Sequence, residues 1–153
     1  MKLRAKSLTH SDFEPFGRLL EPMESEEPEV VEPGLFEFFV TFSNESDGWQ
    51  IGFLKLTGDK VEKLENHPHT PEVFSPLSGK AILVVSNNPE SREDIHAFYL
   101  DTPIVLNEGV WHNVANLSET SEMLIVENTE VGDQFFELSE TLNFADDSYQ
   151  GKG

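Results

Sequence analysis

The chain contains no cysteine, and this absence excludes several kinds of chemistry. It rules out disulfides, thiolate metal ligands and a cysteine nucleophile. Basic residues are scarce: 10 lysines and arginines stand against 29 aspartates and glutamates, which gives a formal net charge of −19. A field of that sign repels nucleic acid phosphates and anionic lipid headgroups, so we expect neither a nucleic acid nor a membrane as partner.

Long apolar segments are absent as well. The opening run MKLRAKSLTHSDF has no apolar core of the length found in signal peptides, and no stretch approaches the length of a membrane span. We therefore expect a cytoplasmic protein. The sequence also lacks a phosphate-binding glycine loop and a serine in a nucleophile elbow, so nothing in it indicates nucleotide binding or serine hydrolysis.

What the chain does contain is a series of short, strand-like segments separated by Gly, Asn, Asp and Pro. They recur at spacings of roughly 8–12 residues with no helical pattern between them, which favours an all-β sandwich or barrel over a parallel α/β sheet. The expected strands are 2–8, 35–42, 49–56, 80–86, 95–100, 103–106, 110–117 and 122–128. The phenylalanines expected mostly to fill the barrel are Phe38, Phe39, Phe42, Phe53, Phe74 and Phe98.

A length of 153 residues suits one domain with a sizeable core. We expect this domain over residues 1–145, with a flexible tail over 146–153. One short amphipathic helix is expected over residues 9–20, with Thr9 or Ser11 as its N-cap. Gly79 and Gly109 are interpreted as turn residues that need a positive φ.

The segment HPHTPE (67–72) raises the question of a metal site. On a strand, side chains at i and i+2 point to the same face, so His67 and His69 would project together. Two imidazoles on one face are a good start for a divalent ion such as zinc, manganese, iron or nickel. His112, which follows Gly109 and opens an apolar strand, is the candidate for the third ligand. The alternative is that these histidines line a cavity without a metal.

Two motifs in this order resemble those of the cupins. The run HPHTPE (67–72), followed six residues later by Gly79, resembles the first cupin motif, and GVWHNVAN (109–116) resembles the second. The resemblance implies an all-β, RmlC-like jelly-roll barrel with a short N-terminal helix. It also implies a metal held by His67, His69, His112 and Glu72. If the chain does not bend at Thr70-Pro71, Glu72 is instead a hydrogen-bond acceptor that orients a ligand imidazole.

Within the cupins, the chain is most similar to the ureidoglycolate lyase family. The likeness covers about residues 1–128, matches poorly over 22–60, and rests on the N-terminal opening and on HP (67–68), VFSPLSG (73–79), AILVV (81–85), IHAF (95–98) and GVWHN (109–113). It implies a homodimer in purine (allantoin) catabolism that converts ureidoglycolate into glyoxylate and urea. The family commonly has a second histidine where this chain has Asn113, whereas His69 restores the general cupin pattern and favours a metal.

Cleavage of a C–N bond in a small 2-hydroxy acid needs a base, and Glu72 is the first candidate for that role if it is not a ligand. His96 is the second candidate, although a place in the barrel wall suits it better. A chain this acidic needs a local positive centre for an anionic substrate, and a divalent ion would supply it. Two alternatives stay open: another metal-dependent cupin enzyme, such as an isomerase or oxygenase acting on a small sugar or acid, and a non-catalytic small-molecule-binding cupin.

Overall fold

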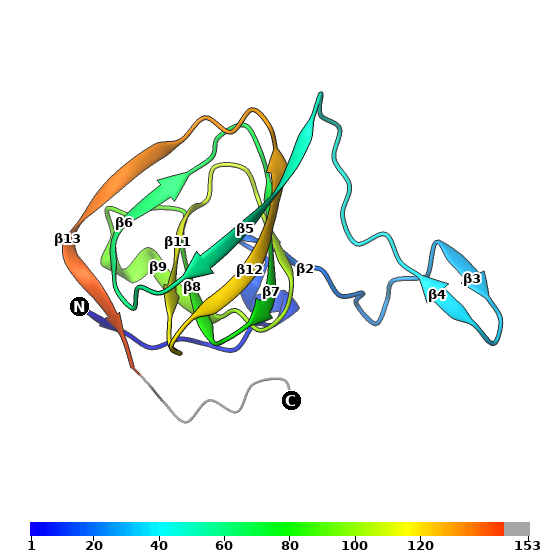
Figure 1. Cartoon of the computed structure of the whole chain (residues 1–153), viewed down its shortest axis with the longest axis horizontal. Coiled ribbons are helices and arrows are strands. Elements are labelled where there is room, and N and C mark those ends of the chain that lie inside the picture. The colour runs from blue at the N-terminus through cyan, green and yellow to red at the C-terminus, as the bar shows by residue number, and fades with distance from the viewer. Residues whose placement is uncertain (146–153) are drawn as a thin grey trace.

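The structure, a computed structural model, describes residues 1–145 and consists mainly of two antiparallel sheets that face each other in a barrel (Figure 1). The six-stranded sheet has, in spatial order, β1 (Lys2–Leu3), β13 (Gln134–Phe144), β6 (Val61–Asn66), β11 (Trp111–Asn116), β8 (Ala81–Ser86) and β9 (Ile95–Tyr99). The five-stranded sheet has β2 (Gly17–Leu19), β10 (Ile104–Leu106), β7 (Glu72–Ser78), β12 (Ser121–Asn128) and β5 (Trp49–Leu56). Among the strand pairs of residues 1–145, β1 and β13 run parallel and the others antiparallel.

The remaining regular elements are small. They are helix α1 (His10–Phe13), a 3₁₀ turn η1 (Arg92–Asp94), and a separate hairpin made of β3 (Val30–Glu32) and β4 (Phe36–Phe38). No helix among residues 1–145 has both the length and the apolar character needed to cross a bilayer. The expected all-β barrel with a short N-terminal helix is therefore confirmed, while the expected tail over 146–153 lies outside the described residues.

The core lies on both faces of β8, whose six residues are all buried. Leu83 and Val85 belong to a cluster that fills the barrel, together with Phe74 and Phe98. Ile82 and Val84 belong to a second cluster on the other face of the strand. This arrangement explains why AILVVS reads as a continuous apolar run rather than as an alternating one.

The N-terminal helix is shorter than expected. Thr9 is the N-cap, and its hydroxyl accepts a hydrogen bond from the Asp12 amide at 3.1 Å, as predicted. The helix ends at Phe13, and residues 17–19 form strand β2 instead. Pro15 lacks an amide proton, and Gly17 lies so close to β10 that an added Cβ would meet the Val105 carbonyl oxygen at 1.9 Å. Pairing with β10 therefore replaces the second half of the expected helix.

The segment 30–42, which we call the arm, also differs from expectation. The strand expected over 35–42 shrinks to β4, which pairs only with β3, and this hairpin projects away from the barrel (Figure 1). Phe38 and Phe42 are exposed on the arm, and Phe53 is exposed on β5, so the prediction that they fill the barrel is wrong. Phe74 and Phe98 do fill it.

Candidate metal centre

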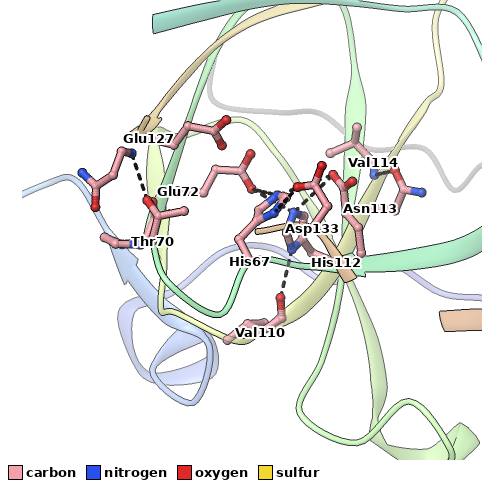
Figure 2. A network of polar contacts seen from close by, with 12 residues as sticks. His67, Thr70, Glu72, Val110, His112, Asn113, Val114, Glu127 and Asp133 are labelled. Carbon is pink, nitrogen blue, oxygen red and sulfur yellow. Dashed lines mark hydrogen bonds and ion pairs between the residues drawn. The ribbon is translucent and has the colours of Figure 1, made fainter. Parts of the chain in front are cut away.

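Four strand ends meet at one end of the barrel and bring ionisable side chains together. His67 lies just after β6, Glu72 opens β7, His112 is the second residue of β11, and Glu127 stands near the end of β12. Pairing of β11 with β6 sets His112 opposite Glu65, and pairing of β12 with β7 sets Glu127 opposite Glu72. The register of two sheets therefore builds this cluster, which Figure 2 shows from close by.

Glu72 lies between the two imidazoles. Its Oε1 is 2.8 Å from Nε2 of His112 and 3.4 Å from Nε2 of His67. The centres of the two rings are 5.0 Å apart, although 45 residues separate them in the sequence. The expectation that a curled sheet brings positions 67 and 112 to a common point is therefore met by the geometry.

In both rings the second nitrogen, Nδ1, lies beside a polar group of a neighbouring residue. Nδ1 of His112 lies 2.9 Å from the Val110 carbonyl oxygen. A neutral ring must donate its proton there, and this leaves the lone pair of Nε2 directed at the cluster. Nδ1 of His67 lies 3.0 Å from Oδ1 of Asp133, a contact that is an ion pair when the imidazole is protonated but is not aligned as a hydrogen bond.

Two overlapping sets of residues have the spacing of metal ligands. One is Glu65, His67 and His112, and the other is His67, Glu72 and Glu127; within each set the ligand atoms lie within 4.8 Å of one another. Oε1 of Glu65 is 3.8 Å from Nε2 of His67 and 3.6 Å from Nε2 of His112. His67 belongs to both sets.

The cluster is buried and incompletely hydrogen-bonded. His67, Glu72 and His112 are each at most 6% exposed. Oε1 of Glu72 and Nε2 of His112 are close to each other, yet neither has a hydrogen-bond partner in favourable alignment. A buried polar atom without a hydrogen bond is costly, and a cation bound between the two atoms would remove that cost. The donor set of two imidazoles and several carboxylates fits a divalent ion of the zinc, manganese, iron or nickel kind.

The electrostatics of the cluster are dominated by its excess of carboxylates. Burial alone would raise the pKa of Glu72, but its contacts with His112 and His67 outweigh burial and lower that pKa to about 2. Burial alone would lower the pKa of His67, but the contact with Glu72 and the charges of Glu65 and Glu127 raise it to about 9. The pKa of Glu127 is raised by burial and by the neighbouring charge of Glu72. The centre therefore attracts positive charge, either as protons on imidazole or as a cation.

His69 does not join this cluster. Residues 67–70 form a turn between β6 and β7 rather than a strand, so the rule that i and i+2 share a face does not apply to them. His69 is exposed on this turn, and a Cβ added at Gly132 would lie 3.0 Å from its ring. It belongs to neither set of residues with ligand spacing. His69 as a ligand therefore stays a prediction that the geometry does not support.

His96 and Asn113 also lie apart from the cluster. His96 is two strands away from His112, with Val85 paired between them, and its ring packs on Phe16 at a centroid distance of 5.6 Å. This wall position is the one that the sequence favoured over catalysis. The amide of Asn113 donates to the Lys63 carbonyl oxygen at 2.8 Å, so this residue ties β11 to β6 instead of facing the site.

Sequence reasoning missed three acidic residues of the site. Glu65 stands two residues before His67, so the HPH pattern itself could have pointed to it. Glu127 lies in an expected strand, but it faces Glu72 because β12 pairs with β7, and the sequence of β12 alone does not predict that pairing. Asp133 lies in an irregular segment before β13 and gives no signal in the sequence.

Comparison with known proteins agrees with this picture. A family model described as "Ureidoglycolate lyase" matches residues 1–144. The "Ureidoglycolate lyase 2" of Rhizobium meliloti (strain 1021) is 25% identical over 160 aligned positions, covering 94% of this chain and 98% of the relative. The "Ureidoglycolate lyase" of Rhizobium etli (strain ATCC 51251) is 26% identical, covering 89% of this chain and 90% of the relative.

Solved structures with a similar chain path include a cupin 2 domain-containing protein from Halorhodospira halophila. It has a TM-score of 0.48 and 13% identity, covering 81% of this chain and 82% of that one. A variant of oxalate decarboxylase from Bacillus subtilis has a TM-score of 0.47 and 20% identity, covering 57% of this chain and 23% of that one.

Proposed function

The chain belongs to the ureidoglycolate lyase family, and from that membership we propose that it is a metal-dependent enzyme that cleaves the C–N bond of ureidoglycolate or a similar small 2-hydroxy acid. The products are glyoxylate and urea. The observation that carries this proposal is the buried pair His67 and His112 around Glu72, in which Oε1 of Glu72 and Nε2 of His112 have no aligned hydrogen bond.

We propose that His67, His112 and Glu72 hold the divalent ion, with Glu65 as a further oxygen donor beside both imidazoles. When bound, such an ion supplies a Lewis acid that anchors the substrate carboxylate and lowers the pKa of its hydroxyl group. Glu72 serves better as a ligand than as a base, because a carboxyl with a pKa of about 2 is a weak proton acceptor. The metal identity among zinc, manganese, iron and nickel is left to measurement.

The reaction moves one proton from the substrate hydroxyl to the departing urea nitrogen, while the C–N bond breaks and the C–O bond becomes a carbonyl. Glu127 is the group in the cluster best suited to carry that proton. Its carboxyl borders Glu72 and His67, and its raised pKa brings it nearer to the working pH than an ordinary glutamate. It would accept the hydroxyl proton and return it to the nitrogen. Phe74, whose ring lies against His112, gives the site an apolar wall.

Two assays test this proposal. Protein purified without a histidine tag should contain about one divalent ion per chain by elemental analysis, and it should release glyoxylate from ureidoglycolate. His67→Ala and His112→Ala should each lose the ion and the activity, while Glu127→Gln should keep the ion and lose the activity. An unchanged metal content in both histidine variants would refute the centre. A bound ion without glyoxylate release would point to another metal-dependent cupin reaction.

Beyond the site, we propose that the enzyme is cytoplasmic, that residues 1–145 are one domain, and that two copies form a homodimer. Family membership supports these statements. The dimer has support of its own from the surface of the barrel, as described next.

A further inference from the structure

The outer face of the five-stranded sheet is apolar, which is unusual for a sheet face that meets water. Leu54, Phe74 and Ile125 point into the barrel, so their neighbours in the strands point outward. We call the outward set on β5, β7 and β12 the outer face: Trp49, Ile51, Phe53, Val73, Leu77, Leu124 and Val126. Trp49, Ile51, Phe53 and Leu77 are each more than half exposed. A patch of this kind marks an interaction surface.

The arm is a second apolar surface. Its exposed apolar residues are Val30, Val31, Leu35, Phe36, Phe38, Val40 and Phe42. Within the described chain its two strands pair only with each other. A lone two-stranded hairpin is marginally stable in water at best, so the arm needs a surface to cover it.

Strand β5 provides an open edge for the arm. Among the described residues it pairs with β12 on one side and with no strand on the other. Proteins normally protect an exposed edge with charges, proline or a covering segment. Here Trp49, Ile51 and Phe53 stand on the edge strand.

We propose that two copies of this chain exchange arms, so that the arm of each copy lies along β5 and on the outer face of the other. Each copy carries one arm and one outer face. In a two-fold dimer, each arm would therefore cover the outer face of the other copy, and no arm or outer face would stay exposed. The residues of the arm and of the outer face would form part of the interface, which in a standard protein–protein complex contains roughly 20–30 residues per partner.

A groove at the base of the arm offers a seat for an incoming side chain. It has a volume of about 260 Å³, with an apolar wall formed by Phe42, Trp49, Val73, Val105 and Val126, and polar residues that include Asn44, Glu127 and Asn128 on its remaining border. An aromatic residue of the partner's arm, such as Phe36 or Phe38, fits the apolar character of this wall. Buried aromatic anchors of this type carry much of the energy of an interface.

Charge also restricts the nature of the partner. Each copy carries a net charge of −19, so two copies repel each other over long range. Contact between them must therefore come from apolar surface, and the arm and the outer face are where this surface is concentrated.

The association is tested by measuring the mass of the untagged full chain by sedimentation at physiological salt, and we expect a dimer. In Phe36→Asp/Phe38→Asp (arm) and in Ile51→Asp/Phe53→Asp (outer face), we expect the dissociation constant to rise by at least about 30-fold, the loss typical of a removed hot-spot side chain. Phe135→Asp is the matched control, because Phe135 is 54% exposed on β13, outside both surfaces, and it should remain a dimer.

Mixing the two variants tests the exchange itself. The arm variant retains an intact outer face and the face variant retains an intact arm, so the mixture can form one of the two contacts. We expect a heterodimer in the mixture although neither variant pairs with itself. Circular dichroism spectra like that of the unaltered chain would exclude unfolding as the cause of dissociation.

The inference rests on the proposed homodimer but not on the proposed chemistry, and the outcomes separate the two. An unaltered chain that sediments as a monomer overturns both the dimer and the exchange. A dimer that survives both double substitutions, or a mixture that stays monomeric, overturns the exchange alone. Metal content and glyoxylate release are separate readouts, so their failure would leave the exchange standing.

Discussion

Glu72 is the residue on which the site depends most closely, because its carboxylate contacts both imidazoles from a buried position. In Glu72→Gln the side chain keeps its size but loses its charge. We expect the affinity for the divalent ion to fall by at least about tenfold, as for loss of a group that ligates or orients a ligand. Titration calorimetry measures this, with Glu62→Gln, an exposed glutamate of β6, as control. Undiminished affinity with lost activity would make Glu72 the base instead.

The pKa of His67 predicts how the stability of the metal-free protein changes with pH. Its pKa of about 9 in the folded protein lies above the ordinary histidine value of 6.5, so its contribution to stability is complete below about pH 6.5 and is lost as the pH rises through 9. After a discount for screening by solvent, we expect the free energy of unfolding to fall by on the order of 1–2 kcal/mol. Urea unfolding at pH 6.5 and pH 9.5 measures it. His67→Gln should flatten this alkaline decline, and an equal decline in the variant would refute the assignment.

The pKa of Glu72 predicts how the stability changes at acidic pH. Its pKa of about 2 in the folded protein lies below the ordinary glutamate value of 4.5, so its contribution to stability is present above about pH 4.5 and is lost as the pH falls toward 2. Unfolding measured between pH 5 and pH 3 should therefore show less acid destabilisation in Glu72→Gln than in the unaltered chain. An identical acid limb in both proteins would contradict the depressed pKa.

At the scale of single residues, the sequence revealed the histidines that sit at fixed places in the strand pairing. His67 comes directly after strand β6 and His112 lies at the start of β11, and they meet as expected. His69 does not, because Pro68 and Thr70 belong to a turn in which alternation is lost. The acidic residues Glu127 and Asp133 depend on tertiary contacts that no local pattern encodes.

At the scale of elements, strand β2 is the clearest case of tertiary contact prevailing over local pattern. Gly17→Ala should destabilise the fold by about 2 kcal/mol or more, because the new Cβ would meet the Val105 carbonyl oxygen of β10 at 1.9 Å and backbone must shift. Gly52→Ala on β5 is the matched control, since its Cβ would find nothing closer than 3.9 Å. Thermal unfolding compares the two variants. Equal melting temperatures would show that β2 tolerates displacement.

Most strands could be predicted from the sequence, because apolar runs such as AILVVS are bounded by turn residues. β6, β7 and β13 were not, since charged residues interrupt the apolar pattern of β6 and β13, and a proline and two serines interrupt that of β7. The arm was misjudged for a different reason. A run rich in phenylalanine indicates that the segment is buried. It does not indicate whether the segment packs inside the barrel of its own chain or against another surface.

At the scale of the whole molecule, net charge and apolar surface act against each other. Because each copy carries −19 charges, the proposed dimer should become tighter as sodium chloride rises from about 20 to 300 mM, since the Debye length shortens from about 20 Å to below 8 Å. Sedimentation at several salt concentrations measures this. Dissociation by salt would indicate that ion pairs, rather than apolar contacts, hold the copies together.

The arm is attached to the barrel at both of its ends. It leaves after β2 and returns at β5, which are the two outermost strands of the same sheet. An exchanged arm would thus be a tethered loop that cannot fray from a chain terminus. Subunits joined in this way would have to release the whole loop before they dissociate. Preformed wild-type dimers that carry different labels should therefore exchange subunits slowly, even in dilute solution.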